Sequence, residues 1–556
     1  MEAEMFVCCP KPNEFYSTTL QLSIVLILAL MLPDLGLTKM YEEPKSFSVQ
    51  DISSLEQVER KVLPKVDVDR LFAEDREQEK MGSSEPPRVA AIANVAFALA
   101  SSGSEQKLPD GRLWRLRIHS PGAKNQSLGI ARFDMPEGAK LWVYDPQRKH
   151  VEGPYTRNHR SSIGSLWTPL IEGDEMVVEV FAPTGAGQPV VEISDVNQGY
   201  RGFNQSGLTG GVEAQCNIDV VCPDGSSWQD QIRAVGAYTY KPSPTSTSLR
   251  YCTGTMLNNT AYDFKSYFLT AHHCTVDTSN QSTVVVYWNF ESPTCGTHTA
   301  GPLDQNQTGA TFRAAYAPTD FRLLELSSRP DPSFNVRYEG WDISDAAPST
   351  SVGIHHPRGD VKAISLSNSI AQSYNYVLGP GDPGILHPMG NHWGVNWDLT
   401  KGTTQEGSSG SCLFGPNERC IGQLHGAFRP DCVNPTTNNG TRSYYGKFSV
   451  SWVGGGSDDT RLGKWLGPLS PGVTGMDGDP HITTTNGVHY DFQAAGEFVA
   501  LRDPNGLEIQ TRQTPVPTSH TITDPYSELP VCVSVNTAVA ARVGGHRVSY
   551  QPKAGS

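Results

Sequence analysis

The sequence lacks an excess of positive charge. Its 44 lysines and arginines are outnumbered by 58 aspartates and glutamates, and the formal net charge is −14. A protein that binds nucleic acid normally presents a basic surface, so nucleic acid is not an expected partner. Helical periodicity is also scarce, whereas short alternating segments between glycine and proline turns are common. We therefore expect a mainly β protein.

Long hydrophobic runs are also rare, and the one present lies near the start, from Leu22 to Leu32. Its apolar core of about ten residues is short for a membrane span and suits the hydrophobic region of a secretory signal. We interpret residues 1–40 as a signal peptide of a secreted protein. An uncleaved signal anchor is the alternative, and it is the only membrane contact that the sequence predicts.

Cysteine is absent between Cys9 and Cys216, and no pair has the C-x-x-C spacing of many metal sites. Of the 11 cysteines, eight fall from Cys216 to Cys432. An even set within one segment is typical of a disulfide-linked, exported domain. No metal and no cofactor is predicted.

Composition divides the rest of the chain. Residues 41–110 are rich in acids and are interpreted as a charged connector at the start of a propeptide. Alternating segments between Leu113 and Ile193 predict a small β-sandwich, and a Gly/Asn/Ser-rich linker follows it. The expected domains are a sandwich propeptide with its linker over 111–210, an all-β barrel domain over 211–469 that a helix at Asp459–Leu466 closes, and a further module over 470–556.

The segment from Gln405 to Leu413 places a serine between glycines. Gly407 and Gly410 allow a sharp turn, because glycine tolerates positive φ. In acyl-transfer enzymes such a loop directs backbone N–H groups at a developing oxyanion. A serine hydroxyl is a poor nucleophile unless a base takes its proton, so the loop has catalytic meaning only if a histidine and an acid accompany it.

The chain supplies both partners. Tyr267–Cys274 is an apolar strand that ends in two histidines and a cysteine, and Asp320 precedes a buried-strand pattern. With Ser409 they give the order His, Asp, Ser. The histidine would take the serine proton, and the aspartate would fix the histidine tautomer and stabilise the imidazolium. Each residue alone has a structural explanation, but the combination predicts nucleophilic catalysis.

These segments resemble the chymotrypsin-fold serine endopeptidases, most closely the secreted bacterial lysyl endopeptidases. The resemblance runs from Gly211 to Pro468 and rests on motifs in one order: Cys216–Cys222, Gly254–Thr260, Thr270-Ala-His-His-Cys274, Asp320-Phe-Arg-Leu-Leu-Glu-Leu326, Gly353–Pro357, Gly407-Ser-Ser-Gly-Ser411, Gly422–Gly426 and Tyr445–Lys447. It implies a two-barrel protease made as a zymogen and acting on proteins or peptides.

The resemblance also implies residue roles. His273, next to the cysteine, is the expected base, and His272 is expected to be structural. Ser409 is the expected nucleophile, and the N–H groups of Gly407 and Ser409 are expected to form the oxyanion hole. The implied disulfides are Cys216–Cys432, Cys222–Cys295 and Cys252–Cys274. Cys412 and Cys420, which the family usually lacks, bracket a predicted hairpin, so we expect a fourth bridge there.

The substrate pocket departs from the family pattern. Lysyl endopeptidases place an aspartate just before the Tyr-Gly-Arg/Lys segment, whereas this chain reads Arg442-Ser-Tyr-Tyr-Gly-Lys447, and the family's pocket tryptophan has no clear counterpart between Tyr374 and Asn391. The expected pocket residues are Thr404, His425 and Ser443. Overall similarity favours cleavage after Lys or Arg, with Asp431 or Glu406 as alternative carboxylates. Glutamyl-type specificity is the alternative, because His425 with Thr404 also resembles glutamyl endopeptidases.

The tail resembles the opening of a von Willebrand factor type D domain in Gly478–Phe492 and Gly496–Val499. A partial, inert β-module is preferred over an adhesion module with Ca²⁺ near Asp477, Asp479 and Asp491. A catalytically inactive adhesion protein on a protease fold is accordingly the second hypothesis for the chain. A metal-dependent hydrolase is a distant third, since Pro357 breaks any helix after His355-His356.

Maturation is expected to remove the residues before about Gly211. The resembling family is cut after lysine, yet Arg201 is the only basic residue between Asn197 and Cys216. Self-cleavage would therefore require acceptance of arginine, or another protease must act.

Overall fold

The computed structural model describes residues 42–80, 85–201, 217–297, 301–377, 382–428 and 442–467, together with the strands of the C-terminal tail. Residues Gly36–Leu466 belong to one compact unit, and the tail from Gly467 belongs to a second, which is treated by itself. No helix within the described ranges is long and apolar enough to cross a membrane. The signal or anchor predicted over 1–40 lies outside the described residues.

The N-terminal domain is a β-sandwich, as the sequence predicts. One sheet has the order β1 (Arg60–Val62), β4 (Gly111–His119), β10 (Glu175–Pro183), β6 (Lys140–Tyr144) and β7 (Val151–Tyr155), with β3 (Ser104–Leu108) also on β4. The facing strands are β2 (Arg88–Ala98), β11 (Val190–Gly199) and β5 (Asn125–Asp134), with β8 (Leu166–Trp167) and β9 (Ile171–Glu172) on β5. Alternate side chains such as Leu116, Leu128 and Val178 fill the space between the sheets.

The stretch expected to be a charged connector, 41–110, is folded in its described part, so that expectation is wrong there. It forms α1 (Lys45–Ser48), η1 (Leu55–Gln57), β1, α2 (Val68–Lys80), β2, α3 (Leu99–Ser102) and β3. The Ala-rich segment from Val89 to Leu99, whose type the sequence leaves open, forms most of β2 because it pairs with a neighbour along both edges. Tertiary pairing overrides the weak strand propensity of alanine.

The first sheet of the protease domain contains β13 (Val235–Tyr240), β14 (Ser248–Leu257), β15 (Tyr267–Ala271), β16 (Val285–Trp288), β17 (Asn306–Thr308), β18 (Ala310–Tyr316) and β19 (Phe321–Leu326). Its strand order is β17-β16-β13-β14-β15-β19-β18. Short helical segments precede, connect or follow these strands: η3 (Pro223–Gly225), α4 (Gln229–Ala234), η4 (His272–Cys274), η5 (Gln281–Thr283), η6 (Ala317–Thr319) and η7 (Pro332–Phe334).

The second sheet has the order β12 (Ile218–Asp219), β21 (Ala363–Ser367), β20 (Ser351–His355), β25 (Cys412–Phe414), β26 (Cys420–Phe428), β27 (Arg442–Lys447), β24 (His392–Asn396), β22 (Gln372–Asn375) and β23 (Ile385–Leu386). The turn η8 (Pro357–Gly359) follows β20. One apolar core joins both sheets, with Leu269 from the first and Ile354 and Phe414 from the second. The predicted chymotrypsin-like two-barrel architecture is confirmed.

The closing helix is shorter than predicted. Within Asp459–Leu466 only α6 (Gly463–Leu466) is helical, and a second helix, α5 (Phe448–Val453), comes before it. Phe448 and Leu466 from these helices are buried in the core that joins the two sheets. Two short helices at the C-terminal end of the protease domain therefore complete its core.

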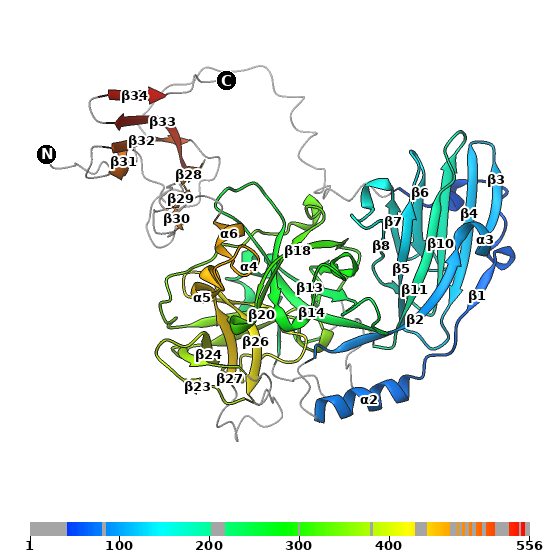
Figure 1. Cartoon of the computed structure of the whole chain (residues 1–556), viewed down its shortest axis with the longest axis horizontal. Helices are drawn as coiled ribbons and strands as arrows, with labels where there is room; N and C mark the ends of the chain where they lie inside the picture. The colour runs from blue at the N-terminus through cyan, green and yellow to red at the C-terminus, as the bar shows by residue number, and fades with distance from the viewer. Residues whose placement is uncertain are drawn as a thin grey trace, which may run out of the picture. The chain divides into compact units, whose positions relative to one another are not determined.

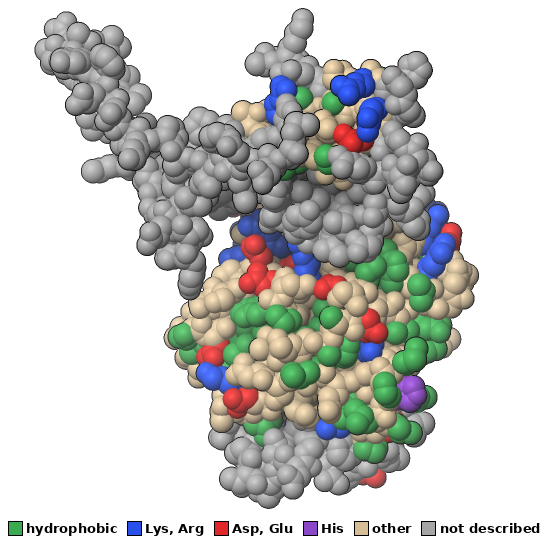
Figure 2. Space-filling view, turned by 90° about the vertical axis from the view of Figure 1, so that its left-hand side faces the viewer, with side chains coloured by type: hydrophobic (Ala, Val, Ile, Leu, Met, Phe, Trp, Pro, Cys, Tyr) green, Lys and Arg blue, Asp and Glu red, His purple; other side chains and the backbone are tan. Residues whose placement is uncertain are grey.

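The sandwich and the protease domain share a sheet. β2 pairs with β11 on one side and with β14 on the other, so the strands of both domains form a continuous 12-stranded sheet. Figure 1 shows β2 reaching from the N-terminal domain to the strands of the protease domain. On the face drawn in Figure 2, the described acidic and basic side chains lie in small groups of both signs among apolar and uncharged ones.

The tail contains two antiparallel sheets of its own. They are β28 (Gly475–Asp477), β29 (His481–Thr483) and β30 (His489–Asp491), and separately β31 (Gly496–Arg502), β32 (Leu507–Val516), β33 (Val533–Val543) and β34 (His546–Tyr550). Asp479 lies outside the described residues, and only the backbone of Asp477 and Asp491 is described. The type D module and its calcium therefore stay predictions.

Three of the four expected disulfides are present: Cys222–Cys295, Cys252–Cys274 and Cys412–Cys420. The last joins β25 to the neighbouring β26, as the predicted hairpin requires. The fourth expected bridge, Cys216–Cys432, lies outside the described residues. The Cys412–Cys420 bridge begins three residues after Ser409 and fixes the strand that follows the Ser409 loop.

Replacing Cys412 and Cys420 together by alanine should lower the free energy of unfolding by about 2–3 kcal/mol, because the bridge closes a short loop. Replacing Cys222 and Cys295 should cost more, about 4 kcal/mol, since their sequence separation is 73 rather than 8. Urea denaturation under non-reducing conditions measures both losses. An unchanged stability of the Cys412/Cys420 variant would show that this bridge does not constrain the unfolded chain.

Candidate active site

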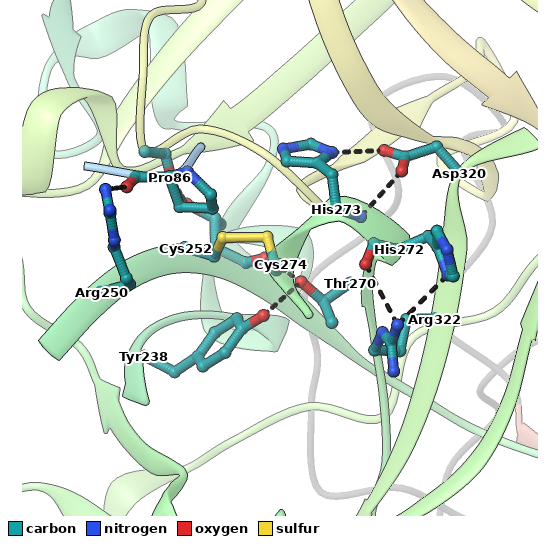
Figure 3. The surroundings of a disulfide bond; sticks show 12 residues. Pro86, Tyr238, Arg250, Cys252, Thr270, His272, His273, Cys274, Asp320 and Arg322 are labelled. Atoms are coloured by element: carbon teal, nitrogen blue, oxygen red, sulfur yellow. Dashed lines mark hydrogen bonds and ion pairs between the residues drawn. A yellow bond between two sulfur atoms is a disulfide. The ribbon is translucent and has the colours of Figure 1, made fainter. Parts of the chain in front are cut away.

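His273 lies on a short turn that a disulfide holds in place. β15 ends at Ala271, and η4 carries His272, His273 and Cys274. Cys274 is bonded to Cys252 on β14, and Thr275 ends the turn in the left-handed region with φ 43°. Figure 3 shows His273 between this disulfide and Asp320. The Cys252–Cys274 disulfide therefore fixes the backbone at the residue next to His273.

Asp320 is positioned by its own backbone as well as by its partners. It follows η6 and adopts a left-handed conformation, φ 59° and ψ 27°, which aspartate tolerates better than most residues. Its Oδ2 accepts from His273 Nδ1 at 2.7 Å, and its Oδ1 accepts from the His273 N–H at 2.9 Å. The His272 N–H donates to the Asp320 carbonyl at 2.7 Å. Backbone and side chain thus clamp the histidine turn together.

The Asp320 carboxylate is 2% exposed. Burial opposes its ionisation, but the charges of His273 and His425 and the hydrogen bonds from His273 outweigh that effect and hold its pKa below the ordinary value. An ionised Asp320 requires the proton of His273 to sit on Nδ1. His273 Nε2 then presents a lone pair, as a general base for a serine needs.

His272 faces the other way, as expected for a structural residue. The Arg322 guanidinium donates to the His272 carbonyl and lies 3.2 Å from His272 Nδ1 (Figure 3). Burial and the positive charge of Arg322 lower the pKa of His272. His272 therefore stays neutral and anchors the turn on β19.

The loop that carries Ser409 packs against β14 and β15. The Thr253 N–H donates to the Ser409 carbonyl at 3.0 Å. A Cβ on Gly410, where φ is +87°, would lie 2.3 Å from Thr270 Oγ1 and 2.6 Å from the Ala271 nitrogen. Glycine at 410 therefore brings Ser409 to the end of β15, where His273 lies. No hydrogen bond joins Ser409 Oγ to His273 in the described part of the chain, and such contacts often tighten only around substrate.

The same loop carries two backbone donors without acceptors. The Ser408 N–H donates to the Gln405 carbonyl at 3.0 Å. Among the described residues, neither the Gly407 N–H nor the Ser409 N–H has a hydrogen-bond partner. Backbone donors are almost always paired in folded proteins, so these two are available to an incoming oxygen. They are the pair that the sequence predicts as an oxyanion hole, a role that requires backbone donors without internal partners.

A buried histidine that the sequence assigned to no catalytic role supports this loop. His355 Nδ1 lies 2.8 Å from Ser408 Oγ, and its Nε2 lies 2.9 Å from Ser365 Oγ. Burial lowers the pKa of His355 to about 3, so the ring is neutral. His356 bonds instead to the Asp360 carbonyl. Because the two histidines serve different polar partners, they do not converge on a metal ion. The one cluster of possible metal ligands in the described ranges is His273, Asp320 and His425.

His425, predicted to line the substrate pocket, lies against the pair formed by His273 and Asp320. Its ring stacks on His273 with centroids 6.0 Å apart, and its Nδ1 lies 2.9 Å from His392 Nε2. The Tyr376 ring meets its edge at 4.9 Å. Burial lowers the pKa of His425, and burial with the neighbouring His425 lowers that of His392 to about 3. This neutral aromatic group shields one face of His273 from water, and His392 and Tyr376 were not found from the sequence.

The other two predicted pocket residues do lie together. Thr404 Oγ1 is 2.6 Å from Ser443 Oγ, which also accepts from Trp397 Nε1 at 2.8 Å. All three side chains are buried. Within the described residues, no carboxylate hydrogen-bonds to Thr404 or Ser443, and Asp431 lies outside them. The described part of the predicted pocket is therefore polar and uncharged.

Two protein families and a curated protease are similar to this chain in sequence. The sequence profile of the family "Lysyl endopeptidase, C-terminal domain" matches residues 210–446, and that of "Lysyl endopeptidase N-terminal domain" matches residues 72–196. A lysyl endopeptidase from Pseudomonas aeruginosa is 27% identical over 325 residues, which is 56% of this chain and 63% of that protein. The chain thus matches less than two thirds of its relative's length. These matches support a serine protease.

Similar solved structures are also proteases. The Rv3671c protease from M. tuberculosis in its active form is 16% identical, with a TM-score of 0.28 over 40% of this chain and 80% of that one. The thermostable serine protease AL20 from an extremophilic microorganism is 12% identical, with a TM-score of 0.26 over 39% of this chain and 91% of that one.

The neutral state of His355 predicts a pH dependence of stability. The unfolded chain binds a proton at His355 below about pH 6.5, whereas the folded chain, with a pKa of about 3, does not. Folding stability therefore falls as pH drops below about 6.5, by about 1.4 kcal/mol per unit. His355→Asn should reduce the loss between pH 7.5 and pH 5 by about 2 kcal/mol, as measured by urea denaturation.

The exposed His387 provides the matched control, because His387→Asn makes the same substitution on the surface and leaves the core unchanged. This variant should keep the full acid sensitivity of the unchanged chain. An equal loss of stability in the His355→Asn variant would contradict a neutral, buried His355.

Proposed function

We propose that this chain is a secreted serine endopeptidase, made as a zymogen, that hydrolyses peptide bonds through an acyl-enzyme intermediate. The observation that carries the proposal is the hydrogen bond of 2.7 Å between His273 Nδ1 and the buried Asp320 carboxylate. This pair lies at the end of β15, against which the loop of Ser409 packs. Both matched family profiles support it. The presence of all three expected catalytic residues, His273, Asp320 and Ser409, argues against the alternative of an inactive adhesion protein.

The proposed reaction has two stages. Ser409 Oγ attacks the carbonyl carbon of the substrate while its proton passes to His273 Nε2, and the oxyanion is bound by the Gly407 and Ser409 N–H groups. The carbon–nitrogen bond then breaks, and the leaving amine takes the proton from His273. In the second stage water gives a proton to His273, its oxygen attacks the ester carbon, and Ser409 Oγ leaves with the proton. Asp320 stays ionised and stabilises the imidazolium in both stages.

Cleavage after lysine or arginine is the specificity that we propose. The support is the lysyl endopeptidase relationship of both matched segments. The described pocket residues Thr404 and Ser443 are neutral and can hydrogen-bond to a cationic or to an amide group. His425 is engaged with His392 and stacked on His273, which weakens the glutamyl-type alternative because that role needs the imidazole free for a carboxylate.

The zymogen proposal places maturation after the sandwich. Arg201, the basic residue considered for self-cleavage, is 5% exposed and its guanidinium pairs with Asp75. A side chain held in this way cannot enter a substrate pocket while the N-terminal domain is folded. Residues 202–216 contain no lysine or arginine. We therefore favour a maturation cut by another protease within that segment over self-cleavage at Arg201.

Ser409→Ala should lower kcat by a factor on the order of 10⁶, because the variant lacks the nucleophile that the base activates. Ser408→Ala is the matched control on the same loop, and it should retain labelling by a fluorophosphonate probe, which the Ser409 variant loses. Hydrolysis of a peptide substrate and probe labelling measure the two effects. Substantial activity in the Ser409→Ala variant would rule out Ser409 as the nucleophile.

The matured enzyme should cleave peptides with Lys or Arg before the scissile bond about 100-fold or more faster, in kcat/KM, than matched peptides with Gln or Glu. A peptide library that varies this one position measures the preference by mass spectrometry. Preferred cleavage after Gln or Glu would refute the basic specificity and leave the endopeptidase proposal in place.

A further inference from the structure

One edge of β14 holds β2 and the nucleophile loop in succession. β14 residues Ser248–Arg250 pair with β2 in antiparallel register. The next N–H on this edge, from Tyr251, donates to the Pro87 carbonyl at 3.2 Å. The following one, from Thr253, donates to the Ser409 carbonyl at 3.0 Å. Residues two apart on a strand point to the same edge and are about 7 Å apart, so the start of β2 lies next to the loop of Ser409.

The direction of β2 matches that of a substrate beyond the cleaved bond. Because the pairing is antiparallel, lower residue numbers in this segment approach Ser409 and higher numbers lead away from it. A bound substrate likewise runs away from the serine in its C-terminal direction after the scissile bond. β2 thus occupies the edge that the leaving-group side of a peptide would use, and main-chain pairing is a common way to bind an extended peptide.

We propose that β2 is an inhibitory segment, which keeps the uncut chain inactive on polypeptides by filling the β14 edge beside Ser409. The same edge receives the leaving-group side of the substrate once β2 is gone. This inference rests on the proposed endopeptidase function and adds where and how the N-terminal domain acts. It also predicts which substrates the uncut chain still accepts, namely those with no residues beyond the cleaved bond.

Charged side chains fix the end of β2 at the site. Arg250 on β14 donates to the Pro86 carbonyl at 2.6 Å and pairs with the Glu85 carboxylate. Figure 3 shows Pro86 and Arg250 on the other side of the Cys252–Cys274 disulfide from Asp320. The segment therefore has a specific polar anchor on β14 within two residues of that disulfide.

A second group of charges lies between the start of β2 and the loop of Ser409. Arg88 Nη2 lies 2.8 Å from Asp75 and 3.0 Å from Glu74, both on α2. A small polar cavity in this region is lined by Asp75, Glu85, Arg88, Arg201, Arg250 and Glu406, among others. Glu406 directly precedes Gly407, one of the two predicted oxyanion donors. The charged end of β2 thus lies at the same cavity as the start of the Ser409 loop.

Apolar burial supplies the rest of the contact. Val89, Ala90 and Ile92 of β2 are buried in one cluster with Leu249 and Tyr251 of the protease domain. Ile92 also donates its N–H to the Thr247 carbonyl at 2.8 Å, which extends the pairing past the end of β14. Because β2 has both main-chain pairing and a buried apolar face, it is an integral part of the interface with the protease domain.

The test uses the full chain with a recognition sequence for a site-specific protease inserted between 202 and 216. Uncut and cut chains are compared with three reagents: a fluorophosphonate probe, a small ester with no residue beyond the cleaved bond, and a peptide that extends several residues beyond it. We expect the uncut chain to react with the first two reagents. The measured quantity is the rate of long-peptide cleavage divided by the rate of ester cleavage. This ratio should be at least about 100-fold lower in the uncut chain than in the cut chain from which the N-terminal fragment has been displaced with urea and removed.

Variants localise the effect within the uncut chain. Ala90→Glu places a charge in the shared apolar cluster and should release cleavage of the long peptide. Glu85→Gln weakens the anchor on Arg250 without disturbing the core, and it should raise that cleavage about two- to fivefold. Glu42→Gln is the matched control, because Glu42 pairs with Lys140 inside the N-terminal domain. It should leave the rate unchanged.

The outcomes separate the two proposals. Rapid cleavage of the long peptide by the uncut chain overturns the inhibitory role of β2 and leaves the endopeptidase proposal intact. Absence of probe labelling in every form, cut or uncut, overturns the endopeptidase proposal itself. Labelling that appears only after cutting shows that the N-terminal domain blocks Ser409 as a whole, which overturns the placement of β2 on the leaving-group side. A Glu85→Gln effect no larger than that of Glu42→Gln also counts against the proposed anchor.

Discussion

The buried carboxylate of Asp320 is the constraint on which the site depends. A charge removed from water is destabilising unless its oxygens accept hydrogen bonds from fixed donors. Here both oxygens accept from one residue, His273, through its ring and through its backbone. The same contacts that satisfy the charge therefore also fix the position and tautomer of the imidazole. The orientation of His273 and the satisfaction of the buried charge of Asp320 thus depend on the same two hydrogen bonds.

β14 links this pair of residues to the other parts of the site. Its Cys252 is bonded to Cys274 beside His273, and its Thr253 binds the carbonyls of Gly407 and Ser409. One strand thus joins the turn of His273 to the loop of Ser409. Since a strand presents main-chain groups along its whole edge, the free part of that edge is open to another extended segment. In this chain β2 takes it, so the element that assembles the site is also the one through which the N-terminal domain reaches it.

The sequence was most informative where short motifs carry chemistry. The order of His273, Asp320 and Ser409 and the Cys412–Cys420 hairpin were predicted from local patterns, because each depends on residues within a few positions. His355, His392 and Tyr376 were not given roles. Their contacts with Ser408 and His425 join segments far apart in the chain, and only strand pairing brings them together.

The same distinction explains the errors in the N-terminal part. An acid-rich stretch predicts a solvated connector when it is considered alone, and an Ala-rich segment has no strong preference for helix or strand. β2 forms because β11 and β14 offer it two edges, and the acids of α2 are ordered because Arg88 and Arg201 lie against Asp75. Arg201 illustrates the limit clearly. It is the only basic residue between Asn197 and Cys216, which made it a candidate for self-cleavage, and its burial depends on a helix more than 100 residues earlier in the chain.

The polar and apolar contacts between the two domains contribute unequally to the free energy of their association. The buried ion pair between Lys241 and Asp195, at 2.9 Å, and the bond from Asn306 to Glu152 are lost when the domains part, but each group then regains water, so their net contribution to binding is small. Apolar contacts such as Val89 and Trp167 with Leu249 and Tyr287 have no such compensation. Affinity must therefore come mainly from the apolar cluster, while the polar pairs fix the register of β2 on β14. A cut in the linker leaves all of these contacts in place, so chain cleavage and release of the N-terminal domain are physically separate steps, and the second one determines when the edge beside Ser409 becomes free.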